Sequence, residues 1–332
     1  MKRQRLAAVL GKTGLRPILA KFLPATGILG LNYHRIGDAG ATRLDRDLWS
    51  ACEEAFDEQL AFLKRHCDVI TPDQIDDARR DRRGVHVLVT FDDGYRDNYE
   101  LAFRALRRHG VPATFFIATG FVDNPRLPWW DEISAIVGST SLDVLRLEPW
   151  FPEPLPIGEP AARHAARRAL LAAYKRLPGT DAAAMLDRLR ETAGVDARGL
   201  ADTLWMTWDM LREMAGNGMT IGGHTVNHVI LSRVPEEEQW QEISGCARRL
   251  EAELGTSMRY FAYPVGKRTS FDAATVACLE RIGVRYAFTY YGGFAGADAN
   301  PYDMPRMAIE PHVDRDWFRA MLQVPRVFCR AA

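Results

Sequence analysis

Apolar runs alternate with segments of helical spacing along most of the chain. Residues 85–91 (VHVLVTF) are almost continuously apolar and predict a buried strand. Residues 97–108 (DNYELAFRALRR) have the spacing of an amphipathic helix, and Gly110 follows as a stop signal. Residues 113–119 (ATFFIAT) then predict the next strand.

The same order of helix, glycine and strand recurs later in the chain, at 207–224 and at 270–290. Strands that alternate with helices are typical of parallel sheets joined by right-handed crossovers. The pattern therefore predicts an α/β fold, and it fits both an α/β barrel and an open, doubly wound sheet.

One stretch interrupts this rhythm. From about residue 122 to residue 203 a proline cluster (148–160) precedes an Ala/Arg-rich helical tract (161–177). We expect a helical insertion at about 122–203 within one α/β unit that spans residues 27–332.

The first 26 residues form a basic, partly apolar N-terminal segment, 1–26. Charged residues and prolines interrupt it, so no apolar window approaches the roughly 20 residues of a spanning helix. It also has no apolar core followed by a small-residue cleavage site. We expect a cytoplasmic protein, with peripheral contact of this segment with the inner face of a membrane as the alternative.

The charge balance bears on the class of binding partner, and the cysteine content bears on the redox state of the thiols. The 332 residues carry 43 Lys and Arg against 43 Asp and Glu, and this balance argues against nucleic acid as a main partner. The five cysteines are odd in number and form no C-x-x-C pair, which indicates reduced thiols. No oligomeric state is inferred.

Candidate chemistry begins where the strand 85–91 ends, at Asp92 and Asp93 followed by Gly94. Adjacent carboxylates repel each other unless a cation or a proton lies between them. Functional groups of parallel α/β folds gather at the carboxyl ends of strands, although Asp-Gly is also common in turns.

Two histidines strengthen the functional interpretation. His224 and His228 (GGHTVNH) follow another predicted strand, and at i and i+4 on a helical turn they would face one side. Two imidazoles and one carboxylate are typical of a catalytic zinc-type site with an open position. Two core or capping histidines are the alternative, but that would leave the aspartate pair unexplained.

These motifs resemble a known family. TFDDG followed by H-T-x-x-H is similar to the first two signatures of the polysaccharide deacetylases, also called carbohydrate esterase family 4 or the NodB-homology family. FAYPVG (261–266) resembles the third signature in a branch associated with extracellular and surface polysaccharides. The resemblance runs from about Gly27 to the end of the chain. It implies a distorted, incomplete (β/α) barrel with the helical segment as an insertion.

The resemblance also implies roles. Asp92 would be the general base, and Asp93, His224 and His228 would bind a divalent metal. Zinc is favoured, with cobalt, nickel and manganese as alternatives. The backbone N–H of Val265 would stabilise the oxyanion.

Further candidates are less constrained by the motifs. Tyr263, within FAYPVG, is a candidate for oxyanion or substrate binding. His312 is the candidate general acid, with an ordinary surface histidine as the alternative. Ala262 stands where the family often has an arginine, and Arg306 is the candidate to replace it beside the base, unless it forms only a surface salt bridge. His34 (NYHRI) would lie at the barrel mouth, near substrate or Asp92, or would be structural.

The expected activity is a metal-dependent carbohydrate N-deacetylase acting on a polymer, an oligosaccharide or a lipid-linked glycan, with the last two favoured because no export signal is recognised. An O-acetyl esterase, a hydrolase of a non-sugar C–N bond and an inactive carbohydrate-binding barrel are the alternatives. Trp129 and Trp130 would stack on sugar rings if exposed, or pack in a core.

Overall fold

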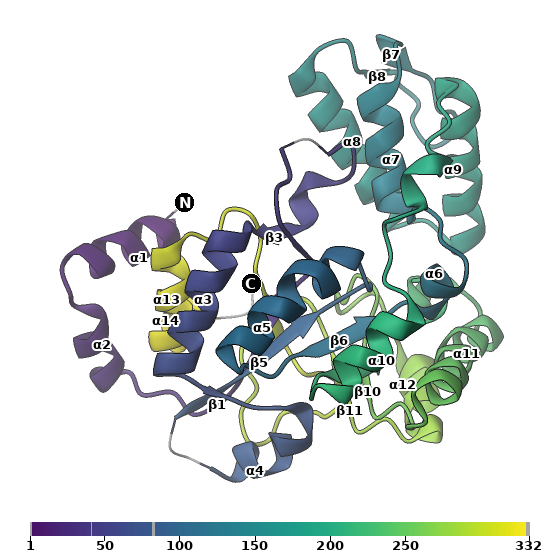
Figure 1. Cartoon of the computed structure of the whole chain (residues 1–332). Coiled ribbons are helices and arrows are strands. Elements are labelled where there is room, and N and C mark those ends of the chain that lie inside the picture. The colour runs from purple at the N-terminus through teal and green to yellow at the C-terminus, as the bar shows by residue number, and fades with distance from the viewer. Residues whose placement is uncertain (1, 41, 82–83, 330–332) are drawn as a thin grey trace.

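The computed structural model describes residues 2–40, 42–81 and 84–329 (Figure 1). The first residue of the predicted segment 1–26 and the last three of the unit 27–332 lie outside the described residues. The main sheet is entirely parallel, in the order β11-β10-β9-β6-β5-β1-β12. Its strands are β1 (Gly27–Tyr33), β5 (Val85–Phe91), β6 (Thr114–Ile117), β9 (Thr220–Gly223), β10 (Tyr260–Ala262), β11 (Tyr286–Phe288) and β12 (Arg306–Ala308), and β4 (Asp68–Val69) pairs with the start of β5.

The sheet closes almost completely on itself. Phe288 of β11 forms a parallel bridge with Met304, two residues before β12, and β12 pairs with β1. The two ends of the strand order therefore lie side by side. This confirms the incomplete (β/α) barrel, and the open doubly wound sheet is excluded.

The pairing of β1 with β5 determines which residues meet at the carboxyl ends of the two strands. All of β1 and nearly all of β5 are buried, because a parallel strand in a barrel is covered on both faces. Their pairing runs from Gly27 opposite Val85 to Tyr33 opposite Phe91. Polar residues placed just beyond Phe91 therefore emerge beside the end of β1.

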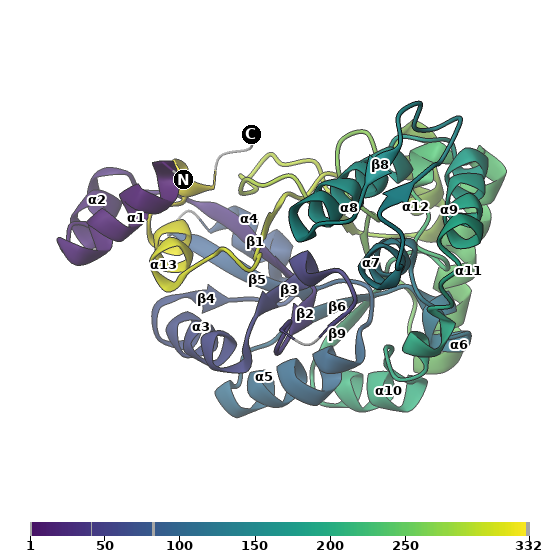
Figure 2. The ribbon, with the colours of Figure 1, turned by 90° about the horizontal axis from the view of Figure 1, so that it is seen from above.

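Helices surround the barrel (Figures 1 and 2). They are α3 (Glu53–His66), α4 (Ile75–Arg80), α5 (Arg104–His109), α10 (Trp208–Gly216), α11 (Glu236–Leu254), α12 (Ala273–Ile282), α13 (Arg315–Gln323) and α14 (Pro325–Phe328). The helix predicted over 97–108 begins as a π-helix, η3 (Asn98–Phe103), and continues as α5, which Gly110 ends with φ of 62°. Short elements complete the set: β2 (Arg35–Ile36), β3 (Trp49–Ala51), η1 (Arg46–Leu48), η2 (Pro72–Gln74), η4 (Arg198–Ala201) and η5 (Leu231–Arg233).

Residues 119–193 form a helical layer at one side of the barrel (Figure 1). It contains α6 (Thr119–Asp123), α7 (Trp129–Ser139), β7 (Val144–Leu145), β8 (Leu155–Pro156), α8 (Pro160–Tyr174) and α9 (Gly179–Ala193). These helices have an apolar cluster of their own, with Ile133, Leu170 and Leu189 fully buried in it. Tyr95 and Trp205 from the barrel join the same cluster, so the layer is packed onto the barrel.

The N-terminal helices α1 (Lys2–Lys12) and α2 (Arg16–Phe22) lie against α13, on the side of the molecule opposite to α9 (Figures 1 and 2). In the described part of the chain, no helix combines the length and the apolar character needed to cross a membrane.

Candidate active site

Four strained backbone positions mark one end of the barrel. In the described chain the non-glycine residues with positive φ are Asp93 (76°), Thr225 (66°), His228 (55°) and Val265 (62°). Positive φ is unfavourable for side chains with a Cβ, and for a β-branched residue most of all. Each of the four follows the carboxyl end of a strand: β5, β9 or β10. Such strain persists where the surrounding structure enforces it, and it is frequent at active sites.

Asp93, His224 and His228 form a buried cluster. Oδ1 of Asp93 lies 3.4 Å from Nε2 of His224 and 3.3 Å from Nε2 of His228. The three candidate ligand atoms all lie within 4.8 Å of one another. The prediction of a helical turn between the histidines is wrong, because residues 224–228 form a loop. Glu242 shapes this loop by accepting hydrogen bonds from the backbone N–H groups of Val226 and Asn227.

The protonation pattern of the cluster suits a cation. Nδ1 of His224 lies 2.7 Å from the carbonyl of Ala262. A carbonyl only accepts, so Nδ1 carries the proton and Nε2 of the neutral ring directs a lone pair toward Asp93. Oδ1 of Asp93 is buried and has no hydrogen-bond donor. A nitrogen–nitrogen–oxygen donor set with facing lone pairs fits a zinc-type divalent metal.

Arg306 and Asn32 hold Asp92. Nη1 and Nη2 of Arg306 donate to Oδ1 and Oδ2 over 2.7 and 2.8 Å, and Nδ2 of Asn32 donates to Oδ2 over 2.8 Å. Burial opposes ionisation of Asp92, but the charge of Arg306 and the hydrogen bonds from its guanidinium outweigh burial and lower the pKa of the carboxyl. Asn32 was not predicted as a site residue, although it is the one amide in the buried strand GILGLNY.

Two further candidates, His34 and Val265, follow the carboxyl ends of β1 and β10. The ring of His34 packs edge-on against Tyr290, with centroids 5.6 Å apart, and its charge helps to lower the pKa of both aspartates. Val265 is half-buried, and its backbone N–H donates to no acceptor in the described residues. An unused, fixed backbone donor is one requirement of an oxyanion-binding position.

The recorded side-chain contacts of Tyr263 and His312 are with residues outside the Asp93 cluster. Tyr263 is buried, stacks on Phe271, and donates its hydroxyl to the carbonyl of Tyr302 over 2.9 Å. The side chain of His312 is 55% exposed and lies 3.3 Å from Glu310. Among the described residues, no hydrogen bond or ion pair joins His312 to the two aspartates.

Trp129 and Trp130 are buried, so the packing interpretation describes them better than exposed sugar platforms. Trp130 lies on the ring of His228, with centroids 4.3 Å apart, and donates Nε1–H to the hydroxyl of Tyr95 over 2.7 Å. Tyr95 in turn donates to Oδ2 of Asp131 over 2.8 Å. A buried polar chain thus supports one of the candidate metal ligands.

A cavity of about 840 Å³ reaches the cluster at His228. It lies between α7, α9 and the loop that leads to η5, and its walls include Trp129, Leu177, Leu186 and Ile230. Most of the lining side chains are apolar. Arg233 also lines the cavity, and its Nε is buried without a hydrogen-bond partner.

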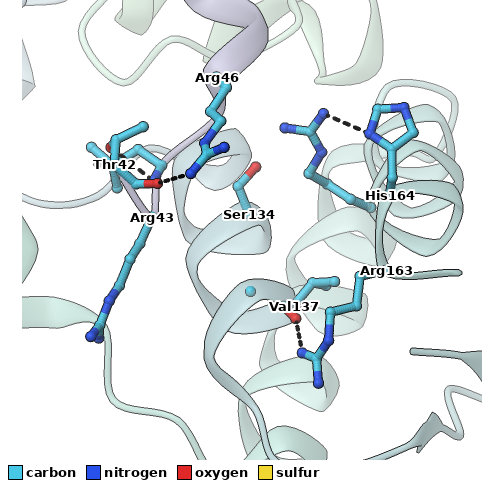
Figure 3. Close-up of a pocket in the computed structure, with 10 residues that line it drawn as sticks. Thr42, Arg43, Arg46, Ser134, Val137, Arg163 and His164 are labelled. Atoms are coloured by element: carbon cyan, nitrogen blue, oxygen red, sulfur yellow. Dashed lines mark hydrogen bonds between the residues drawn. The ribbon is translucent and has the colours of Figure 1, made fainter. Parts of the chain in front are cut away.

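A second hollow, of about 370 Å³, lies between the loop before β3 and helices α7 and α8 (Figure 3). It is basic, but two of its arginines are occupied by backbone carbonyls: Arg46 donates to Thr42 and Arg163 to Val137. It shares no lining residue with the Asp93 cluster. We therefore assign it no part in the site.

Comparison with known proteins points to one family. The family model described as polysaccharide deacetylase matches residues 79–144 and 180–287. A putative polysaccharide deacetylase, YxkH of Bacillus subtilis (strain 168), is 20% identical over 237 residues, which cover 71% of this chain and 56% of that protein. This chain therefore spans little more than half the length of that relative.

Solved structures share the fold. The Streptococcus pyogenes deacetylase PplD, solved in complex with acetate, superposes with a TM-score of 0.59 at 18% identity, covering 91% of this chain and 98% of that one. IcaB from Ammonifex degensii gives a TM-score of 0.57 at 20% identity, covering 91% and 98%. At these identities the similarity shows a common barrel.

Proposed function

The chain belongs to the polysaccharide deacetylase family, and we propose that it is a metal-dependent hydrolase that removes N-acetyl groups from an acetylated carbohydrate. The observation that supports this most strongly is the position of Asp92, paired with Arg306, next in the chain to Asp93 and its buried partners His224 and His228. A divalent metal held by these three residues would polarise the acetyl carbonyl and acidify water.

Asp92 is the proposed general base. A carboxylate has about four lone-pair positions. Arg306 occupies one on Oδ1, while Arg306 and Asn32 occupy both on Oδ2. One position on Oδ1 is left to take the proton of the attacking water. Arg306 keeps the carboxylate ionised and fixes its direction, which makes it a positioning residue.

The other groups of the proposed reaction come from the loops around the cluster. The N–H of Val265 would donate to the oxyanion that forms when water adds to the acetyl carbon. The C–N bond then breaks, releasing acetate, and the amine takes a proton. We propose His312 as its source. Tyr290 would give its hydroxyl proton to the amine and take one from His312 by way of Glu310, which lies 3.3 Å from His312 and 3.2 Å from the Tyr290 hydroxyl.

The cavity beside His228 favours one substrate class among the acetylated carbohydrates. An apolar wall disfavours a purely hydrophilic polymer and suits a hydrocarbon chain. The buried, unpaired Nε of Arg233 suits an anionic group on that chain. We propose a lipid-linked glycan as substrate.

The test is acetate release from matched N-acetylated and O-acetylated oligosaccharides by the metal-loaded protein and by Asp92→Asn. We expect release from the N-acetylated series and a loss of roughly 100-fold or more in the variant, because a positioned base contributes that much. Preference for the O-acetylated series would establish an esterase instead. A metal-loaded protein that binds the glycans without releasing acetate would be a binding barrel.

A further inference from the structure

The N-terminal helices expose most of the large apolar side chains found at the surface. Eight such side chains are exposed in the described residues, and five of them belong to residues 6–22. They are Leu6, Val9, Leu15, Ile18 and Phe22, with Phe22 exposed to 78%. The spacings 6, 9 and 15, 18, 22 place them on one face of each helix.

Other side chains of the two helices fix them to the barrel. Ala7 and Leu10 of α1 are buried in the main apolar cluster, where Leu19 of α2 also packs. Arg16 donates to the carboxylate and to the backbone carbonyl of Asp316 at the start of α13, both over 3.1 Å. The apolar outer face is therefore presented by a docked pair of helices.

The charge of this segment has one sign. Residues 1–26 contain six Lys and Arg and no Asp or Glu, whereas the whole chain is neutral. Arg3, Arg5, Lys12 and Lys21 are exposed, and none of them forms an ion pair with another described residue. The positive charge thus accompanies the exposed apolar side chains.

We propose that α1 and α2 dock on the surface of a membrane that contains anionic lipid. A helix with an apolar face and cationic flanks inserts its apolar side chains at the headgroup boundary and is attracted by the negative lipids. A second copy of the chain fits less well, because it would bring like charges together. The arrangement of Phe22, Ile18 and Lys21 within one helix supplies both contributions at once.

The test uses the full chain in flotation with vesicles of phosphatidylcholine, with and without about 30% phosphatidylglycerol, an anionic lipid. Two variants remove one contribution each: Ile18→Ser/Phe22→Ser and Lys12→Glu/Lys21→Glu. The matched control, Leu142→Ser/Leu200→Ser, removes exposed apolar side chains outside the segment. Thermal unfolding shows that each variant is folded.

We expect the wild-type protein to bind the anionic vesicles, and both segment variants to bind at least about tenfold more weakly. High salt should weaken binding, and the control should stay within about twofold of the wild type. No binding to the anionic vesicles, or an equal loss in the control, would overturn the proposal. A wild-type dimer that Ile18→Ser/Phe22→Ser converts to monomer would assign the surface to a second copy instead.

Discussion

Arg306 and Asp92 form a bidentate pair in the interior of the barrel, with Nη1 2.7 Å from Oδ1 and Nη2 2.8 Å from Oδ2. Arg306 has no exposed surface, and it also donates to the hydroxyl of Thr90 and to the carbonyl of Thr289. The arginine comes from β12 and the carboxylate from the end of β5, so the closure of the barrel brings them together.

Replacing Arg306 should separate its effect on stability, which comes from its charge, from its effect on kcat, which comes from the geometry of its guanidinium. In Arg306→Met the buried carboxylate loses its partner, and the free energy of unfolding should fall by about 3–5 kcal/mol. Arg306→Lys keeps the charge but not the planar fork, so we expect a folded protein whose kcat falls by roughly tenfold or more. Urea unfolding and acetate release measure the two effects. The double variant Asp92→Asn/Arg306→Met is the control, and it should be more stable than Arg306→Met. A wild-type stability for Arg306→Met would contradict this account.

Asp131 predicts a pH dependence of stability. Burial raises its pKa from 3.8 to about 7. Between these values the folded protein holds a proton that the unfolded chain has released, so stability falls as the pH rises through this window. Asn cannot ionise, so the stability of Asp131→Asn relative to the wild type should be higher at pH 8 than at pH 5. Urea unfolding at both values measures this, and a pH-independent difference would be the contrary result.

Tyr95 should affect both stability and metal binding, because its hydroxyl accepts the hydrogen bond of Trp130. In Tyr95→Phe the buried Nε1–H of Trp130 and the carboxyl of Asp131 both lose a partner, which costs about 1–3 kcal/mol. Since Trp130 packs on His228, we also expect weaker metal binding, by roughly tenfold. Tyr99→Phe is the matched control, because its hydroxyl bonds Glu213 at the surface. Equal effects of the two variants on metal binding would remove the link to Trp130.

The cavity predicts that kcat/KM depends on whether the substrate carries a hydrocarbon chain. Ala183 and Ala184 are adjacent, exposed residues of α9, and only Ala183 lines the cavity. Ala183→Trp should therefore fill the cavity, and Ala184→Trp should leave it open. With N-acetylated saccharides that do or do not carry a dodecyl chain, the wild type and Ala184→Trp should prefer the dodecyl compound by about tenfold or more in kcat/KM. Ala183→Trp should lose that preference while still releasing acetate from the chain-free compound. Equal kcat/KM values of the wild type for the compounds with and without the dodecyl chain would contradict the lipid-linked substrate.

The sequence predicted alternating strands and helices because their signals are local, and the family resemblance of the motifs, rather than this pattern, implied the barrel. The strand 85–91 was predicted with the bounds that the structure has, since a run of β-branched and apolar residues ends at two charges. Gly110 marks the end of the helix for a similarly local reason, its left-handed φ of 62°. The turn around His224 was not predictable, because its shape depends on Glu242 of α11.

Some residues of the candidate site could be predicted from local motifs, and others could not. Asp92, Asp93, His224 and His228 lie in short motifs at strand ends, where a pattern identifies them. Asn32 and the Tyr95–Asp131 contact join residues far apart in the chain, and only the register of β1 with β5 or the packing of α7 brings them together. Burial decided the interpretation of Trp129 and Trp130, and burial is a tertiary property.

The central claim is that Asp93, His224 and His228 hold a metal. Metal content per chain, measured by mass spectrometry on the purified and reloaded protein, tests it most directly, beside Asp93→Ala, His228→Ala and the exposed-loop control His312→Ala. We predict nearly one divalent metal per chain in the wild type and in the control, and a sharp loss in the other two variants, because each removes one of three protein ligands. A wild-type protein that stays free of metal after reloading, or ligand variants that retain it, would contradict the account.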